Sequence, residues 1–291
     1  MIDNLYDGLG DAITYCWMVK SAEAAGIDAR LNIRRWKELG EMFGVSHLLT
    51  DEESDRKKKD GGNGSPHWNR EIELVREGTR LNRFQIWCGE HGLGRLDPSR
   101  PAFRGDPVAL EWAERAWIDR EAASGGGERV LFVPGGAWAN RTTPNAIMCD
   151  AAYTLANAGL SVAACDVDKD DVDNFPFFFY GMKLEYSAAL AARADVVIAN
   201  DSGMAHLAGT IGVPTVAVCG MTNPDVVFGH IPEVRGLRGG HGKVWCAGCH
   251  FSPKSYRASC AKGCLALMSI DPMEIVKIVL ETLKTKRRII K

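Results

Sequence analysis

The sequence lacks a large net charge, an apolar segment of membrane-spanning length and the features of a secretory leader. Its 35 Lys and Arg nearly balance its 37 Asp and Glu, so the whole chain has no electrostatic attraction to nucleic acid or anionic membranes. No apolar run approaches the roughly 20 residues of a transmembrane helix, and the N-terminus has no basic or apolar leader region. We therefore expect a cytoplasmic protein without a transmembrane segment.

The content of apolar and charged residues, 46% and 25%, is that of an ordinary globular chain. A chain of 291 residues is long enough for two domains. The Gly-rich stretch 124–127 is the best linker candidate, which predicts one domain over residues 1–123 and a second over 128–291. Strand and helix patterns alternate in both halves, so we expect an α/β protein whose two parallel-sheet domains face a cleft.

Residues 194–222 predict a strand, a helix and a second strand, because apolar β-branched runs flank a helical pattern that begins after Ser202-Gly203. Parallel strands present their carboxyl ends at one edge of a sheet, where open α/β sheets bind ligands. The free amides and positive dipole of this helix start suit a phosphate or diphosphate. Asp201 would either cap the helix or hold a ribose hydroxyl.

The remaining pattern predicts further elements. We expect helices over 12–19, 36–43, 70–94, 108–122, 144–159, 187–193 and 272–288, and strands over 29–33, 45–49, 130–133 and 160–164. Residues 167–186 are expected to be irregular. The polar stretch 51–69, which contains Lys57–Lys59, is expected to be either a solvated insertion or a lid or acceptor-binding loop.

Four of the nine cysteines are crowded near the C-terminus. Two residues separate Cys246 from Cys249, three separate Cys260 from Cys264, and ten lie between the pairs. Two close thiolate pairs can bind one tetrahedral ion, so the segment 246–264 predicts a metal knuckle that holds zinc or iron. Four thiolates fill the coordination sphere, which makes the expected site structural. Unligated thiols or disulfides are the alternative.

Three short motifs, far apart in the sequence, occur in the order expected for one known family. They are Gly10-Asp11, the sequence RTTP at 141–144, and DSGMAH at 201–206 followed by GMTNP at 220–224. They resemble the Gly-Asp, K-x-W-P, D-[ST]-G-x-x-H and G-x-T-x-P motifs of the ADP-heptose:LPS heptosyltransferase family, and the last pair is the most specific match. The resemblance implies the GT-B architecture, in which two Rossmann-like domains face a cleft.

The resemblance also implies roles for individual residues. Asp11 would be the general base, and Arg141 would contact the donor diphosphate, keeping the charge of the family's Lys and adding a bidentate fork. The other candidates for binding a nucleotide sugar are Gly10, Gly136, Asp201, Ser202, Gly203, His206 and Thr222. Helix capping is the alternative role of Asp11, and a hydrogen-bonded interior position is the alternative for His206.

The implied reaction is an inverting transfer of a heptose or hexose from a nucleotide-diphosphate sugar to a hydroxyl on a glycan, lipid-linked glycan or protein. Such a transfer needs a base, a positioned donor and stabilisation of the leaving diphosphate. Arg141 and the helix dipole would supply the last, so no catalytic metal is required. The four-Cys segment is similar to the metal finger of autotransporter heptosyltransferases, described there with iron.

Two features of the sequence depart from the family pattern. The long apolar strand usual before the Gly-Asp motif is nearly missing, and the N-terminal half is short, so acceptor recognition is not carried over. Two other functions therefore stay open. One is a glycosyltransferase acting on modified DNA bases, which Lys57–Lys59 and the basic tail 284–291 would permit. The other is a non-catalytic protein whose metal knuckle contacts nucleic acid or a partner.

Overall fold

The computed structural model divides by contacts into two compact units, each of which is described by itself. One unit is Met1–Arg104 with Asp225–Ile231, and the other is Gly105–Pro224 with Pro232–Lys291. The described residues are 2–3, 8–29, 31–32, 36–45, 66–136, 138–240, 244, 246, 249, 260 and 263–290.

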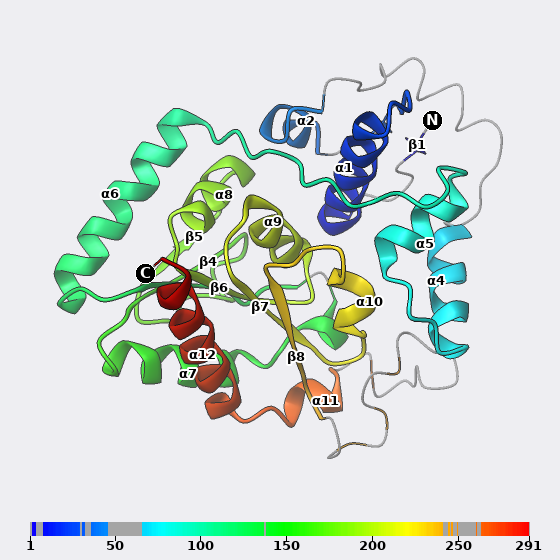
Figure 1. Cartoon of the computed structure of the whole chain (residues 1–291). Coiled ribbons are helices and arrows are strands. Elements are labelled where there is room, and N and C mark those ends of the chain that lie inside the picture. The colour runs from blue at the N-terminus through cyan, green and yellow to red at the C-terminus, as the bar shows by residue number, and fades with distance from the viewer. Residues whose placement is uncertain are drawn as a thin grey trace. The chain divides into compact units, whose positions relative to one another are not determined.

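The second unit is built on one parallel sheet of six strands (Figure 1). The strands are β3 (Arg129–Val133), β4 (Ser161–Asp166), β5 (Phe178–Tyr180), β6 (Val196–Asn200), β7 (Thr215–Cys219) and β8 (Val234–Arg238). Their order across the sheet is β5-β4-β3-β6-β7-β8. This is the 3-2-1-4-5-6 order of the doubly wound dinucleotide-binding fold. The predicted α/β class is therefore confirmed.

Helices cover both faces of this sheet (Figure 1). They are α6 (Pro107–Ser124), α7 (Asn145–Asn157), α8 (Leu184–Ala192), α9 (Gly203–Ile211), α11 (Leu265–Met268) and α12 (Pro272–Ile290), with a 3-10 turn η1 (Ala139–Arg141). Side chains alternate between the faces along each strand. Phe132 and Ile198 belong to the core shared with α7, α11 and α12, whereas α6 packs on β4 and α8, and α9 on β6 and β7.

Most of the elements expected in this half are confirmed. The strands at 130–133, 160–164, 196–198 and 215–218 all form. The final helix begins at Pro272 as predicted, and the Met273 N–H donates to Asp271 Oδ1 over 2.9 Å. The expectation of irregular structure over 167–186 is wrong in part, because this stretch contains β5 and the start of α8. β5 has only three residues, which is too short for the alternation of a strand to show in the sequence.

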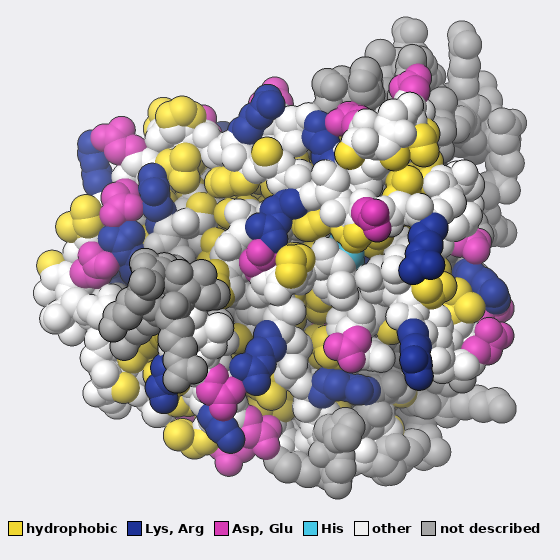
Figure 2. Space-filling model, viewed as in Figure 1, with side chains coloured by type: hydrophobic (Ala, Val, Ile, Leu, Met, Phe, Trp, Pro, Cys, Tyr) yellow, Lys and Arg dark blue, Asp and Glu magenta, His cyan; other side chains and the backbone are white. Residues whose placement is uncertain are grey.

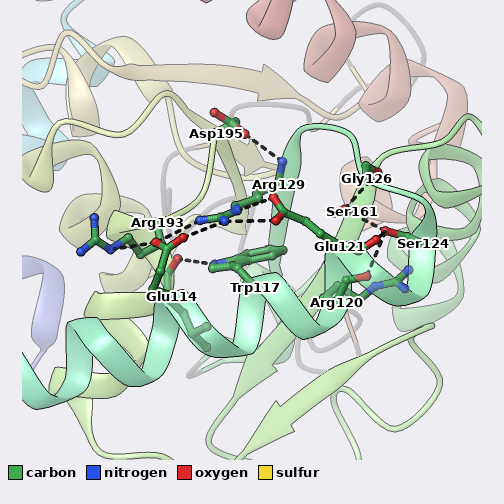
Figure 3. Close-up of polar contacts among 11 residues, drawn as sticks. Glu114, Trp117, Arg120, Glu121, Ser124, Gly126, Arg129, Ser161, Arg193 and Asp195 are labelled. Carbon is green, nitrogen blue, oxygen red and sulfur yellow. Dashed lines mark hydrogen bonds and ion pairs between the residues drawn. The ribbon is translucent and has the colours of Figure 1, made fainter.

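Helix α6 is fixed to the second unit by polar contacts (Figure 3). Arg129 at the start of β3 pairs with Glu114 and Glu121 of α6, and the two salt bridges raise the pKa of the arginine. The buried Trp117 indole donates to the Leu190 carbonyl of α8. The contact boundary thus lies before α6, at residues 104 and 105, instead of at the expected linker 124–127.

The Gly-rich stretch itself is a packed turn. The hydroxyl of Ser161 donates to the Gly126 carbonyl over 3.1 Å and lies 2.8 Å from the Ser124 hydroxyl. Gly127 has φ of +104°, and a side chain there would overlap the carbonyl oxygen of Gly159. Glycine at this position therefore allows two backbone segments to approach closely, which a flexible linker would not require.

The first unit contains mainly helices in its described part. They are α1 (Leu9–Ala24), α2 (Glu38–Met42), α4 (Pro66–Arg76) and α5 (Arg83–Glu90), with a parallel pair of short strands, β1 (Ile2–Asp3) and β2 (Leu31–Asn32). The helix α10 (Pro224–Phe228) leads into this unit from the C-terminal half. The strand expected over 45–49 and the stretch 51–65 with Lys57–Lys59 lie outside the described residues, apart from Val45.

Charges of both signs are interspersed on the surface. Figure 2 shows Lys and Arg side chains close to Asp and Glu side chains over the visible face. Within the described part of the chain, no helix has the length and apolar character needed to cross a membrane.

His230 lies in an aromatic environment of the first unit. Its ring stacks on Phe84 at 5.8 Å and meets the edge of Trp17 at 5.6 Å, and only 3% of the residue is exposed. Burial, with a contribution from the nearby Arg83 charge, lowers the pKa of His230 to about 3. The histidine is therefore neutral in the folded protein at physiological pH.

We predict that His230 makes the protein less stable in mild acid. In the unfolded chain the histidine takes up a proton near pH 6.5, whereas in the folded chain it does so only near pH 3. The unfolded state therefore binds more protons between these values, so stability falls as the pH drops through this window. In urea titrations from pH 7 to 4, the His230→Phe variant should lose stability less steeply, by up to about 1.4 kcal/mol per pH unit. Equal slopes for the two proteins would contradict this.

Candidate functional site

The centre of the parallel sheet in the second unit is a switch point. β3 continues into η1 and α7 on one face, whereas the neighbouring β6 continues into α9 on the other. Chain segments that leave adjacent strands for opposite faces open a crevice at the carboxyl ends of those strands, which is where ligands bind in such sheets. The loops after Val133 and after Asn200 form this edge.

Asn200 ties the two loops together. It is fully buried at the end of β6, where its Oδ1 accepts hydrogen bonds from the Thr143 backbone N–H at 3.0 Å and from the Thr143 hydroxyl at 2.6 Å. Its Nδ2 donates to the Pro134 carbonyl. One amide side chain therefore fixes both ends of the segment 134–143, which carries Arg141.

Asp201 is the hydrogen-bonding centre of the site. Its carboxylate is buried, with Oδ1 accepting from Arg141 Nη2 at 2.9 Å and Oδ2 from the Thr222 hydroxyl at 2.6 Å. Arg141 Nε also donates to the Asp201 carbonyl at 3.0 Å. The structure thus brings together three residues that the sequence assigned to the donor site. Asp201 holds the other two in place and does not cap α9.

The N-terminus of α9 adjoins this cluster. Ser202 is the N-cap residue, yet its side chain makes no capping bond, and its buried Oγ has no hydrogen-bond partner among the described residues. The Oδ1 atom of Asn140, the residue before Arg141, is also buried without a hydrogen-bond partner among the described residues. Gly203 begins the helix, and the N–H groups of Gly203 and Met204 have no partner within the helix, whereas that of Ala205 donates to the Ser202 carbonyl at 3.2 Å. Polar groups of this kind at a helix start suit an anionic ligand.

Asp166 lies at the end of β4, next to the loop after Val133. Its Oδ2 accepts the Gly135 N–H at 2.7 Å, and its Oδ1 accepts the Val167 N–H at 2.7 Å. Burial raises the pKa of Asp166, although these hydrogen bonds act in the opposite direction. A side chain at Gly135 would overlap this carboxylate, so the residue must be glycine for the contact to form.

The rim of the site contains Gly136 and Trp138. A side chain at Gly136 would lie 2.5 Å from the Thr142 hydroxyl, so the loop can only turn here without one. The Trp138 ring is 53% exposed and lies with its centroid 5.9 Å from the Arg141 guanidinium carbon. His206, by contrast, is 1% exposed on α9, which agrees with an interior position.

Asp11 and Gly10 belong to the first unit, in the first turn of α1. Gly8 is the N-cap residue and no side chain caps this helix start, so the structure does not support capping as the role of Asp11. The Asp11 carboxylate is 12% exposed and its Oδ1 lies 3.9 Å from Arg83 Nη1.

The predicted metal knuckle is not confirmed. Among the described residues, no three His, Cys, Asp or Glu side chains are gathered in a way that would hold a metal ion. Cys264 is buried in the core of the second unit, and Cys249 packs against that core. Most residues between Cys246 and Cys264 lie outside the described part of the chain.

Sequence reasoning missed two residues of this site. Neither Asn200 nor Asp166 is among the site residues predicted from the sequence. Both are polar residues that directly follow a run of buried strand residues, and this placement was the available signal. Their partners, Thr143 and Gly135, are distant in sequence, and no local pattern identifies them.

The sheet has the strand order of the doubly wound α/β folds, and the polar cluster lies at its switch point. The comparisons with known proteins agree. The sequence model of Glycosyltransferase family 9 (heptosyltransferase) matches residues 181–243, which include β6, α9 and β7. No curated protein matches the chain by sequence.

Three solved structures are similar over nearly the whole chain. The ADP-heptose LPS heptosyltransferase II of E. coli is 14% identical, with 98% of both chains covered and a TM-score of 0.61. A family 9 glycosyltransferase from Veillonella parvula DSM 2008 is 15% identical, with 98% of this chain and 96% of that chain covered and a TM-score of 0.64.

The third is TibC of enterotoxigenic E. coli, an iron-containing dodecameric glycosyltransferase. It is 15% identical, with 98% of this chain and 78% of that chain covered and a TM-score of 0.64. TibC has also been solved with ADP-D-β-D-heptose. At these identities the likeness establishes the fold, so the expected GT-B heptosyltransferase fold is confirmed. Together with the family match it supports a glycosyltransferase.

We predict that the Thr222 hydroxyl stabilises the site. In Thr222→Val the shape is kept, but Oδ2 of the buried Asp201 loses its hydrogen-bond donor. The free energy of unfolding should therefore fall by about 1–3 kcal/mol in urea titrations. Thr222→Ser, which keeps the hydroxyl, is the matched control and should be the more stable variant. A valine variant as stable as the serine variant would show that this hydrogen bond does not stabilise the fold.

Proposed function

We propose that the protein is an inverting glycosyltransferase that moves a heptose or hexose from a nucleotide-diphosphate sugar to a hydroxyl acceptor. The observation that carries the proposal is the Arg141–Asp201–Thr222 cluster beside the N-terminus of α9. It lies at the switch point of the sheet, and two of its three residues fall within the stretch that matches the family model.

The donor diphosphate would lie at the start of α9. The Ser202 hydroxyl and the first amides of the helix would donate to its oxygens, and the partly exposed Arg141 would add a positive charge. Because Asp201 fixes the guanidinium through two hydrogen bonds, this charge is oriented before the donor binds. Asp166 would accept hydrogen bonds from ribose hydroxyls, as acidic residues after the second strand do in this fold.

The reaction would be a single displacement. Asp11 takes the proton of the acceptor hydroxyl, and the acceptor oxygen forms a bond to the anomeric carbon. The bond from that carbon to the diphosphate oxygen breaks, and its electron pair stays on the leaving diphosphate. Arg141 and the α9 dipole stabilise the charge that develops there. No metal is needed for any of these steps.

The proposed donor is ADP-heptose, since TibC has been solved with it. The acceptor class is a glycan, a lipid-linked glycan or a protein. The choice among these acceptors, like the cytoplasmic location, stays a prediction from the sequence.

The donor site can be tested separately from the chemistry. In a thermal-shift panel of ADP-, UDP-, GDP- and CDP-sugars, ADP-heptose should raise the Tm by mass action. Arg141→Lys keeps the positive charge but loses the planar guanidinium, so the affinity of this variant for ADP-heptose should fall about tenfold or more. Asp11→Asn should keep the Tm shift and lose about 10²–10⁴ in transfer rate.

Arg235→Met is a matched control, because Arg235 is an exposed arginine of the same unit that pairs with Glu281 on the surface. It should bind the donor as the unchanged protein does. If no nucleotide sugar raises the Tm, the donor site is wrongly assigned. If Asp11→Asn transfers sugar at the normal rate, another group is the base.

We also propose a structural metal at Cys246, Cys249, Cys260 and Cys264. The spacing of the four cysteines supports it, as does the iron in TibC. Elemental analysis of the purified protein should find about one zinc or iron per chain. Cys246→Ser should lose it, and Cys149→Ser, which changes a core cysteine of α7, should not. A protein that holds no metal, or the same amount in both variants, would refute the knuckle.

A further inference from the structure

A buried charge cluster in the first unit has no part in the scheme above. Arg83 of α5 binds Glu71 of α4 with two nearly parallel hydrogen bonds, Nε to Oε2 at 2.9 Å and Nη2 to Oε1 at 3.0 Å. The side chains are 2% and 0% exposed. The remaining nitrogen, Nη1, lies 3.9 Å from Oδ1 of Asp11. One guanidinium therefore stands between two carboxylates, one of which is the proposed base.

The guanidinium is held rigidly. The two bonds to Glu71 fix its plane, and Trp87, one turn further along α5, has its ring centroid 5.3 Å from the guanidinium carbon. Helix α5 itself is anchored at its start by a capping box, in which Asn82 and Gln85 exchange hydrogen bonds. Arg83 thus has little freedom to turn away from Asp11.

The two oxygens of Asp11 have different surroundings. Oδ1 is the atom nearest to Arg83. Oδ2 lies against Gly8, where a side-chain carbon would be only 2.8 Å away. Gly8 itself is exposed. A glycine at position 8 therefore leaves room for the Asp11 carboxylate.

We propose that Arg83, clamped by Glu71, is a positioning residue whose charge orients the Asp11 carboxylate to accept the acceptor's proton. This inference rests on the proposed function, because it assigns a task to the proposed base. It adds two residues that act through Asp11 and do not touch the substrate.

The charges around Asp11 determine how its pKa should respond to substitution. Arg83 faces it from α5, and Glu71 lies beyond Arg83 on α4. His230, in the segment after α10, also interacts with both residues, but it is neutral above about pH 3 because its pKa is lowered. Glu71 and Arg83 are thus two charges that a titration of Asp11 would sense.

The test is the titration of Asp11 in the full chain, followed by ¹³C NMR of its carboxyl carbon and assigned with Asp11→Asn. Arg83→Met removes the positive neighbour and should raise the pKa of Asp11 by about one unit. Glu71→Gln removes the negative one and should lower it by a smaller amount. In a plot of the transfer rate against pH, the decline on the acid side should move to higher pH in Arg83→Met and to lower pH in Glu71→Gln.

The matched control is the exposed pair Arg70–Glu73 on the same helix α4, at 42% and 57% exposure. Arg70→Met and Glu73→Gln should leave the titration of Asp11 unchanged. If Arg83→Met does not fold, Arg83→Lys replaces it and should give a smaller rise, since an ammonium cannot keep both bonds to Glu71 and the approach to Asp11.

The opposite signs distinguish positioning from a purely structural role, in which both substitutions would only weaken the fold. Shifts of the same sign, or none, would overturn the proposal. If the NMR shifts appear but no sugar is transferred under any condition, the coupling of Arg83 to Asp11 stands and the proposed function is wrong. If transfer is normal but the shifts are absent, the proposed function stands and the coupling is wrong.

Discussion

The loop arrangement of the second unit depends on the hydrogen bonds that the buried carboxylate of Asp201 requires. Asp201 is 2% exposed, and an ionised carboxylate at that depth destabilises a fold strongly unless it is paired and hydrogen-bonded. Arg141 and Thr222 meet that need from two other loops. The desolvation of Asp201 thereby holds the loops after β3, β6 and β7 in one arrangement.

The central strands and the start of α9 could be predicted from the sequence, because β3, β6 and β7 are apolar runs buried on both faces and Ser202-Gly203 follows one of them. The pairing of Arg141 with Asp201 could not, since sixty positions separate them and each has a local explanation. The same applies to Asp166, whose partner Gly135 becomes adjacent only when β3 and β4 pair. β5 could not be predicted because it forms by pairing at the edge of the sheet. The domain boundary could not be predicted because salt bridges between β3 and α6 decide it.

The two units handle buried charge in different ways. In the second, one carboxylate organises an arginine that remains 17% exposed. In the first, the Arg83 guanidinium donates two hydrogen bonds to Glu71 and has its third nitrogen 3.9 Å from Asp11 Oδ1. An arginine suits both arrangements because its planar fork can bind one carboxylate with two nitrogens and still present a third.

The assignment of residues 225–231 to the first unit has a consequence for synthesis of the chain. His230 packs on Trp17 and Phe84, so the ring that completes this aromatic core leaves the ribosome more than a hundred residues after the rest of it. A nascent chain that ends near residue 104 would expose this incomplete core to solvent. The N-terminal core can therefore be completed only late in translation, after strands β3 to β7 of the second unit have been synthesised.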